Sequence, residues 1–415
     1  MVAAGQSRQA REECFYFFSH ERVPTLEKIP NKPLRIMIVA GESSGDTHAA
    51  TLVNAIQQVS PVPVEFFGGT GPQLRAQSVA SVIHTDDLSI LGLLEIGRAL
   101  PKFLAAYKKL KSAAVEQNAD GVILVDWPDF NFRLARALHR RGLKVIYYIS
   151  PQLWAWRSYR AESIQQNVDL LLTILPFEKE WYARRGVAHV EYVGHPLAGE
   201  VHSKYDRMEF CRLHKLDPAL PIVSLLPGSR KKELQRILPV MIEAAERVNQ
   251  RCLNQQRKEV QFLIVLASGR SPREITELLG GQDNYRVVES ATREALAASD
   301  AAVVASGTAT LEAALLNTPM VIVYKESFLN WHLLGPLINV EHYGLVNLIA
   351  RRRLATELIQ SDFTPQRLSQ ELESMLVADR NAVMRQELRA LVQELGQGGA
   401  ARRAAALIVN LLTAR

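Results

Sequence analysis

Short apolar runs along this chain alternate with longer stretches in which apolar residues recur at helical spacing. In the first half, the runs at residues 35–40, 64–68, 121–125, 144–149, 170–174 and 190–193 predict buried strands. The alternation restarts after a polar connector near 201–221, with strands predicted at 222–226, 261–265, 285–288, 301–305 and 320–324. Strands that alternate with helices are typical of parallel sheets covered by helices. We therefore predict an α/β protein with two Rossmann-like, doubly wound parallel-sheet domains.

Domain boundaries follow from the same pattern. We assign residues 34–200 to the first domain and 201–380 to the second, which suits a length of 415 residues. Helical periodicity alone continues from about Thr364, so residues 381–415 are expected to form helices able to pack back on the first domain. Residues 1–33 mix charged residues with proline and are interpreted as a poorly ordered extension or a misassigned start. Because such sheets bind ligands at the carboxyl ends of their strands, we expect a cleft between the domains.

Composition narrows the class of protein. With 47% hydrophobic and 22% charged residues the chain is typical of a globular protein, and no apolar run approaches the ~18 residues of a membrane span. Cys14, Cys211 and Cys252 lie far apart without metal-ligand spacing, so we expect reduced thiols in a cytoplasmic protein, with no disulfide and no metal site. The net charge of +6 favours phosphates, an anionic membrane surface or nucleic acid as partners, without choosing among them.

A turn with the features of a phosphate-binding loop begins the second domain. Gly228, Ser229 and Arg230 stand between the strand at 222–226 and a helix predicted from Lys231. The first N–H groups of a helix are unpaired and carry the positive end of its dipole, which attracts phosphate. Glycine lets the backbone approach a ligand, serine can cap the helix or bond a phosphate oxygen, and arginine can hold a diphosphate. The alternative is a capped helix start with an exposed arginine.

A second turn of this kind follows the strand at 301–305. It contains Ser306, Gly307, Thr308, Thr310 and Glu312. We interpret it as a second nucleotide-binding turn, in which the two threonines contact phosphate or base and the glutamate accepts from ribose hydroxyls. In the alternative, the glutamate is only favoured by the helix dipole. Two such turns in one domain strengthen the prediction of a nucleotide site.

The first predicted strand runs into Gly41-Glu42-Ser43-Ser44-Gly45-Asp46 and then a helix. The spacing fits the G-x-S-x-G elbow of α/β-hydrolases, in which Ser43 would be the nucleophile. Such an elbow follows several strands rather than the first, and no acid and histidine in the required order are recognisable downstream. We favour a glycine-rich turn at which the backbone approaches a ligand, with Asp46 as the cap of a helix over 47–59.

Asp126 is the best candidate for a general base. It follows the strand at 121–125 and should face the cleft, where partial desolvation raises the pKa of a carboxylate. The alternative is a turn carboxylate that bonds backbone amides. Asp129 is expected to cap the next helix.

Aromatic side chains follow two other strands of the first domain. Trp154 and Trp156 stand on one loop, where they would stack on a sugar face or, alternatively, pack between the domains. His195 would be an acid or base in the cleft, although we favour a structural hydrogen-bonding role.

The stretch from Leu91 to Lys111 interleaves apolar residues with arginine and lysine. Such a basic amphipathic helix can rest on a membrane or accept acyl chains, and the alternative is a helix that packs on a sheet. No Asp-x-Asp pair stands where it would hold a metal on a diphosphate, so Arg230 and helix dipoles are expected to neutralise the leaving group.

Several segments together carry a resemblance to a known family. They are Ile38-Val-Ala-Gly-Glu-Ser-Ser-Gly-Asp46, Asp126-Trp-Pro-Asp-Phe-Asn131, Ser150-Pro-Gln-Leu-Trp-Ala-Trp-Arg157, Leu175-Pro-Phe-Glu178, Gly194-His-Pro196, Leu226-Pro-Gly-Ser-Arg230, Ala305-Ser-Gly-Thr-Ala309 and Asn347-Leu-Ile349. In order and spacing, over roughly residues 34 to 410, the chain resembles the lipid-A-disaccharide synthases.

The resemblance implies the two-domain glycosyltransferase fold called GT-B, and we expect no cofactor and no metal. It implies transfer of 2,3-diacylglucosamine from its UDP carrier to 2,3-diacylglucosamine 1-phosphate, which gives the β-1,6-linked disaccharide and UDP with inversion. It also implies that Asp126 is the essential aspartate, that Arg230 binds the diphosphate, and that Asn347 belongs to a Pro-Asn-Leu motif. Val346 replaces the proline of that motif here, and Trp127 stands where the family usually has alanine.

Both implied substrates are amphiphiles, so we expect the basic stretch to contact the cytoplasmic face of the inner membrane peripherally. A homodimer is left open, and nucleic acid is not expected as a partner. One alternative is another UDP-sugar enzyme of the same fold, such as an epimerase or a peptidoglycan glycosyltransferase. The other is a noncatalytic membrane or nucleic-acid-binding protein, which would not need two nucleotide-binding turns.

Overall fold

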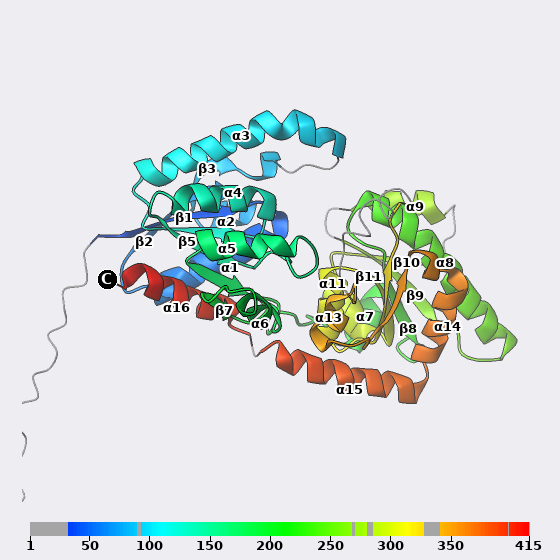
Figure 1. Cartoon of the computed structure of the whole chain (residues 1–415). Helices are drawn as coiled ribbons and strands as arrows, with labels where there is room; N and C mark the ends of the chain where they lie inside the picture. The colour runs from blue at the N-terminus through cyan, green and yellow to red at the C-terminus, as the bar shows by residue number, and fades with distance from the viewer. Residues whose placement is uncertain are drawn as a thin grey trace, which may run out of the picture.

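The computed structural model describes residues 32–88, 93–267, 270–279, 285–327, 341–396 and 398–414. Two parallel sheets form the centres of two lobes, with helices packed around each sheet (Figure 1). The predicted fold class, two doubly wound α/β units, is therefore confirmed. The predicted N-terminal extension lies outside the described residues except for residues 32 and 33, and so does the start of the basic stretch, at residues 91 and 92.

In the first lobe seven strands lie in the order β3-β2-β1-β4-β5-β6-β7. They are β1 (Leu34–Ala40), β2 (Val64–Thr70), β3 (Ala80–His84), β4 (Gly121–Val125), β5 (Lys144–Tyr148), β6 (Leu170–Thr173) and β7 (Val190–Tyr192). The helices are α1 (Ser43–Val59), α2 (Pro72–Ala76), α3 (Leu93–Glu116), α4 (Pro128–His139), α5 (Ala161–Asn167) and α6 (Glu178–Ala183), with 3-10 turns η1 (Asp86–Leu88) and η2 (Ser158–Arg160). The central pair, β1 and β4, runs in register from Ile36 beside Gly121 to Ala40 beside Val125. Both strands are apolar because helices cover both faces of the sheet.

In the second lobe six strands lie in the order β10-β9-β8-β11-β12-β13. They are β8 (Ile222–Leu226), β9 (Gln261–Leu266), β10 (Arg286–Glu289), β11 (Ala301–Ala305), β12 (Met320–Tyr324) and β13 (Thr356–Ile359). The described helices are α7 (Arg207–His214), α8 (Lys231–Asn254), α9 (Pro272–Leu279), α10 (Thr292–Ala298), α11 (Thr308–Leu315), α13 (Leu345–Ala350), α14 (Pro365–Met375) and α15 (Ala378–Glu394), with η4 (Gln360–Asp362). The central pair here is β8 and β11. Strands β8 and β11 thus correspond to β1 and β4 of the first sheet.

The structure contains elements that the apolar pattern missed. Predicted strands agree with observed ones throughout, with differences only at their ends, but β3, β13 and α7 were not predicted. Strands β3 and β13 are edge strands, and Ala80, Ser81 and His84 of β3 are exposed. Strand β3 mixes exposed and buried side chains, and β13 begins with Thr356 and Glu357, so no continuous apolar run marks either strand. Helix α7 lies in the predicted polar connector and buries only Phe210 and Cys211.

Aspartates at the amino ends of strands tie neighbouring strands together. In the first sheet, Asp120 precedes β4 and its Oδ2 accepts from the backbone N–H of Arg35 in β1 at 2.7 Å. Asp169 precedes β6, and its Oδ2 accepts from the backbone N–H of Val145 in β5 at 2.9 Å. Each carboxylate thus pairs a backbone N–H that begins a neighbouring strand.

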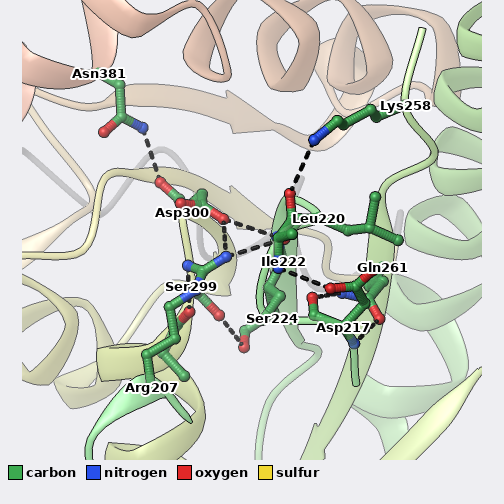
Figure 2. Close-up of polar contacts among 12 residues, drawn as sticks. Arg207, Asp217, Leu220, Ile222, Ser224, Lys258, Gln261, Ser299, Asp300 and Asn381 are labelled. Atoms are coloured by element: carbon green, nitrogen blue, oxygen red, sulfur yellow. Dashed lines mark hydrogen bonds and ion pairs between the residues drawn. The ribbon is translucent and has the colours of Figure 1, made fainter. Parts of the chain in front are cut away.

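Asp300, which precedes β11, has the same role in the second sheet with more partners (Figure 2). Its Oδ2 accepts from the backbone N–H of Ile222 at 2.8 Å and from Nη2 of Arg207 at 3.0 Å. Asn381 of α15 donates to the carbonyl oxygen of Asp300 at 2.8 Å. Strand β8, helix α7 and helix α15 are therefore joined at the amino end of this sheet.

The two C-terminal helices pack on different lobes (Figure 1). Helix α15 packs on α11 and α13 of the second lobe, whereas α16 (Ala400–Thr413) packs on α1 of the first. Apolar residues of α16, among them Ala404 and Ile408, are fully buried in the core that α1 and the first sheet share. Arg403 Nε donates to the carbonyl oxygen of Val193 at 2.8 Å, which fixes the helix beside the end of β7.

Candidate active site

A pocket of about 450 Å³ lies at the carboxyl ends of the strands of the second sheet. Its lining includes both predicted nucleotide-binding turns, through Gly228, Ser229, Arg230, Ser306, Gly307, Thr308 and Glu312. Val265 and Ala267 at the end of β9, and Thr292 at the start of α10, complete the wall. The structure thus brings the two turns together around one cavity. No sequence motif surrounds Thr292, so its place in the pocket wall is visible only in the folded chain.

Glu233 caps the start of α8 in the first of these turns. Its Oε2 accepts from the backbone N–H groups of Ser229 and Arg230 at 3.2 Å each, and its Oε1 accepts from Arg230 Nη1 at 3.1 Å. Serine at 229 can cap a helix, but the N-cap residue here is Arg230, and Glu233 at the N3 position supplies the glutamate half of a capping box by accepting from the N–H of Arg230. Gly228 has a φ of +109°, and a Cβ there would lie 2.5 Å from Glu233 Oε2, so glycine is required. The side chain of Arg230 is 79% exposed and borders the pocket.

The second turn is held by hydrogen bonds of its own residues. The backbone N–H of Ser306 donates to the carbonyl oxygen of Val323 at 2.8 Å, and its hydroxyl donates to the carbonyl oxygen of Tyr343 at 2.9 Å. Thr308 is exposed at the pocket wall. Thr310 is fully buried and its hydroxyl donates to the carbonyl oxygen of Gly307 at 2.8 Å. The prediction that Thr310 contacts a nucleotide is therefore wrong, because its hydroxyl points into the turn and stabilises it.

Glu312 lines the pocket but already has a cationic partner. Arg293, the second residue of α10, donates from Nε to Glu312 Oε1 at 3.2 Å. The same guanidinium donates from Nη1 to the carbonyl oxygen of Glu200, in the segment between the two sheets, at 3.2 Å. A ribose hydroxyl would therefore share the Glu312 carboxylate with Arg293.

Asn347 is not among the described residues that line the pocket. Its side chain is fully buried, donates to Glu357 Oε1 and to the carbonyl oxygen of Ala355, and accepts from the backbone N–H of Ala355, all at 2.8 Å. Glu357 in turn accepts from the backbone N–H groups of Tyr343 and Gly344. The prediction of direct donor contact by Asn347 is thus corrected, since its amide bonds Ala355 and Glu357, and Glu357 in turn bonds Tyr343, to which Ser306 donates.

Asp126 follows β4 in the first lobe and has a left-handed backbone, with φ of +49°. Its carbonyl oxygen accepts from the hydroxyl of Tyr147 and from Nδ2 of Asn131, each at 2.7 Å. Trp127 also has a left-handed φ, of +51°. Left-handed conformations at non-glycine residues cost about 1–3 kcal/mol each and persist only where the surroundings impose them. Tyr147 and Asn131, whose side chains are both fully buried, therefore hold this turn in place through the carbonyl oxygen of Asp126.

The carboxyl group of Asp126 has an unusual affinity for protons. Burial, and next to it the negative charge of Glu42, raise its pKa from 3.8 to about 6. A carboxylate with a pKa near neutrality is well suited to accept a proton and can pass it on again. The predicted partial desolvation of this residue is therefore confirmed.

The glycine-rich turn after β1 packs directly against Asp126 and Trp127. A Cβ on Gly45 would lie 3.8 Å from the Cβ of Asp126, and a Cβ on Gly41 would overlap the indole of Trp127 at 1.9 Å. The two glycines therefore let the turn and the Asp126 segment approach closely, so that the exposed Glu42 and Ser44 border the same place. Ser43 is the first residue of α1.

Asp46 does not cap the helix to which it belongs. Helix α1 begins at Ser43, so Asp46 lies inside its first turn and is buried. Its carboxylate accepts from the backbone N–H groups of Gly71, Gln73 and Leu74 at 3.0, 2.7 and 3.2 Å, which form the start of α2. The prediction of a cap for a helix over 47–59 is thus wrong, because the partner of Asp46 is a helix distant in the sequence.

The remaining predicted cleft residues have mainly structural partners. Trp154 donates from Nε1 to Glu178 Oε1 at 3.1 Å and packs against the core of the second lobe, which matches the alternative of interdomain packing. Trp156 is 40% exposed, with the guanidinium of Arg157 4.1 Å from its ring centre. The guanidinium of Arg157 therefore already lies over this indole ring.

His195 is buried, and burial together with the charge of His48 lowers its pKa to about 3. Its Nδ1 accepts from the backbone N–H of Leu197 at 3.2 Å, which is the structural role that we favoured. Asp129 does not cap α4, whose N-cap residue is Trp127; it is exposed and pairs with Arg157 and Arg160.

The described part of the chain contains neither a candidate metal site nor a candidate membrane-spanning helix. Within it, no group of three or more His, Cys, Asp or Glu side chains is arranged to hold a metal ion. Nor does any helix in that part combine the length and apolarity that a membrane crossing requires. Helix α3 packs on the first sheet through buried residues such as Ala106, Leu110 and Ala113, so the sheet-packing alternative for the basic stretch holds for that face.

Comparison with solved structures defines the class of fold. The chain is similar to a putative UDP-N-acetylglucosamine 2-epimerase from Listeria monocytogenes, with 14% identity, a TM-score of 0.63 and coverage of 92% of this chain and 97% of that one. It is also similar to a glycosyltransferase from Rickettsia africae, with 12% identity, a TM-score of 0.59 and coverage of 93% and 100%. Together with the two sheets, these likenesses identify the GT-B fold.

Sequence comparison defines the family. The family model for lipid-A-disaccharide synthetase matches residues 36–410. A lipid-A-disaccharide synthase from Nitrosococcus oceani is 41% identical over 379 residues, which cover 91% of this chain and 96% of that protein. The chain belongs to the lipid-A-disaccharide synthase family.

Proposed function

We propose that this protein transfers 2,3-diacylglucosamine from UDP-2,3-diacylglucosamine to 2,3-diacylglucosamine 1-phosphate. The products are the β-1,6-linked disaccharide 1-phosphate and UDP. Family membership supports this reaction, and the observation that carries it is the pocket in which two helix N-termini, those of α8 and α11, face one cavity beside Arg230. Helix N-termini attract the phosphates of a nucleotide-sugar donor.

In the proposed mechanism Asp126 removes the proton from the 6-hydroxyl of the acceptor while that oxygen attacks the anomeric carbon of the donor. The bond from the anomeric carbon to the diphosphate breaks in the same displacement, so the configuration inverts and the electron pair leaves with UDP. The pKa of about 6 for Asp126 leaves the carboxylate ionised at neutral pH and still basic enough to accept the proton.

The negative charge that develops on the leaving UDP needs a positive environment. In our proposal the guanidinium of Arg230, the backbone N–H groups of the 228–230 turn, and those of Gly307 and Thr308 supply it. Thr308 and Glu312 contact the nucleotide, whereas Thr310 and Asn347 hold the pocket wall in shape. Since these groups already carry the positive potential, turnover is expected to continue in EDTA.

We also propose that α3 places the enzyme on an anionic membrane surface, where its amphiphilic substrates lie. Leu100 and Leu104 of α3 are 50% and 47% exposed, and Lys102, Lys108 and Lys109 are exposed beside them. A hollow of about 650 Å³ between α3 and β3 includes Lys102 and Lys109 in its lining. Lysines near an anionic surface contribute about 1 kcal/mol each to binding, and exposed leucines add apolar burial.

The membrane proposal is tested by sedimentation with liposomes that contain anionic lipid. Replacing Lys108 and Lys109 by serine should weaken binding by roughly tenfold or more, while Lys179→Ser on α6 should change it little. Equal binding by all three proteins would exclude a role for the basic face of α3.

The transfer reaction is tested by mixing purified protein with UDP-2,3-diacylglucosamine and labelled 2,3-diacylglucosamine 1-phosphate in detergent and EDTA. The expected product is a labelled disaccharide 1-phosphate, identified by mass. If folded protein binds UDP and yet forms no disaccharide, the proposed acceptor is wrong. If UDP itself fails to raise the melting temperature, the proposed nucleotide pocket is wrong.

A further inference from the structure

One acidic side chain contacts the very groups that should bind the diphosphate of the donor. The Glu233 carboxylate accepts from the backbone N–H groups of Ser229 and Arg230 and from the guanidinium of Arg230. Glu233 also lines the pocket in which both nucleotide-binding turns meet. The carboxylate of Glu233 therefore occupies hydrogen-bond donors that our proposed function assigns to the phosphates of the nucleotide.

The close fit of this carboxylate depends on Gly228. A Cβ at that position would lie 2.5 Å from Glu233 Oε2 and 3.0 Å from Glu233 Cβ. The missing side chain thus gives room to the Glu233 carboxylate as well as to an incoming ligand. A phosphate oxygen that approached the N–H groups of Ser229 and Arg230 would enter the space that Glu233 Oε2 fills.

Two anions cannot share these donors at low cost. A carboxylate and a phosphate within hydrogen-bonding distance of the same N–H groups repel each other, and each N–H can make one strong bond. The diphosphate must therefore displace the Glu233 side chain and break the Arg230 ion pair before it can use the turn fully. The energy lost in that displacement is subtracted from the affinity for the nucleotide.

We propose that Glu233 is an internal competitor for the donor diphosphate, which weakens retention of UDP and helps to expel it after transfer. This inference rests on the proposed function of the pocket. It makes Glu233 a positioning residue with two states: bonded to the 229–230 turn without nucleotide, and displaced by the diphosphate. It also explains why a capping glutamate stands in a phosphate-binding turn, where its charge opposes the ligand.

The test compares calorimetric titrations of UDP and of uridine into wild type and Glu233→Gln. Glutamine can keep the capping box because its carbonyl oxygen accepts from the same N–H groups, but a neutral acceptor bonds them less strongly. We expect UDP to bind Glu233→Gln about fivefold to tenfold more tightly, since its competitor is weaker. Uridine lacks the diphosphate, so its affinity should stay the same. In transfer assays, the UDP concentration that halves the rate should be lower for Glu233→Gln than for wild type by the same factor.

Glu274→Gln is the matched control for charge. Glu274 pairs with Arg270, whose Nε donates to the carbonyl oxygen of Ser229, so it lies close to the turn without bonding its N–H groups. If Glu274→Gln and Glu233→Gln raised the affinity for UDP equally, the effect would be one of general charge, and the proposal would be overturned. Unchanged or weaker UDP binding by Glu233→Gln would also overturn it.

Glu233→Ala separates competition from capping. It removes the competing carboxylate and the cap together, so UDP should bind more tightly although the melting temperature falls. Looser UDP binding in folded Glu233→Ala would mean that Glu233 aids the diphosphate, against the proposal. If wild type bound no UDP at all, the proposed function of the pocket would fail first, which distinguishes the two failures.

Discussion

Asp300 and Asp126 are aspartates beside a central strand of each parallel sheet, but they stand at opposite strand ends. Asp300 precedes β11 and pairs the backbone N–H of Ile222 and the guanidinium of Arg207 (Figure 2). Asp126 follows β4, with a left-handed backbone and a carboxyl group whose pKa is raised to about 6. The same residue type thus bonds a neighbouring strand at one end of a sheet and has a raised pKa at the other.

The difference shows that polar side chains have different roles at the two ends of the strands. At the amino ends, Asp120, Asp169 and Asp300 pair backbone N–H groups and join strands. At the carboxyl end of β4, Tyr147 and Asn131 bond the backbone of Asp126 rather than its carboxylate. Their donors hold the backbone of Asp126, and the hydrogen bond from the backbone N–H of Trp127 to its carboxylate lowers the pKa less than burial raises it. Stability at the first end and chemistry at the second should therefore be separable by mutation.

The largest expected effect is that of Asp126→Asn on transfer. Without its general base the enzyme should lose about a hundredfold to ten-thousandfold in kcat. Stability should not fall: the folded-state pKa of about 6 exceeds 3.8, so the ionised carboxylate costs stability above pH 6, and that cost fades as pH falls toward 3.8. Activity assays and thermal melts at pH 8 measure both effects. Asp129→Asn, at an exposed neighbour, is the matched control, and near-normal turnover by Asp126→Asn would refute its role.

Asp300→Ala should show the reverse behaviour. It leaves the N–H of Ile222 and the guanidinium of Arg207 without their carboxylate, and unpaired groups of this kind cost about 1–3 kcal/mol each. We expect the free energy of unfolding in urea to fall by about 2–3 kcal/mol. The kcat of the folded fraction should be unchanged. A variant with normal stability but no transfer activity would break the proposed separation of the strand ends.

Tyr147→Phe should produce a smaller loss of activity. It removes one of the two donors that hold the carbonyl oxygen of Asp126, a bond worth about 0.5–1.5 kcal/mol. We expect kcat to fall about threefold to tenfold with little change in KM, since the base is misplaced and the donor pocket is intact. Tyr148→Phe, at the next position on the opposite face of β5, serves as the control. Equal losses in both variants would point to general damage of the strand.

The smallest effect expected is a change in pH dependence caused by Glu42→Gln. The charge of Glu42 is the second cause of the raised pKa of Asp126, after burial. Its removal should lower that pKa, so the variant should stay active at lower pH than wild type while activity at pH 8 changes little. Profiles of kcat/KM against pH measure this. A profile that moved to higher pH would contradict the electrostatic account.

Sequence reasoning predicted the buried strands and singled out the two turns that line one pocket, because these features are local. A fully covered parallel strand gives a continuous apolar run, as at 121–125 and 222–226, and a phosphate-binding turn gives its glycine and its charged residue in one short segment. Strands β3 and β13 were missed because polar residues, such as Ser81 and Glu357, interrupt their short sequences.

The roles of single side chains were harder to predict because their partners are distant in the sequence. Asp46 caps α2 rather than α1. The side-chain amide of Asn347 already makes its hydrogen bonds to Ala355 and Glu357. Nothing local distinguishes a threonine that lines the pocket, such as Thr308, from one that bonds its own turn, such as Thr310. Burial and hydrogen-bond direction decide these cases, and both appear only in the folded chain.

The most direct test of the central claim is the pH dependence of kcat/KM for disaccharide formation by the wild-type enzyme. If Asp126 is the base and burial sets its pKa, activity should be high above pH 7, half-maximal at about pH 6 and lost below it. A profile that remains flat down to pH 4.5 would contradict the account, because the carboxylate would then be either unperturbed or uninvolved.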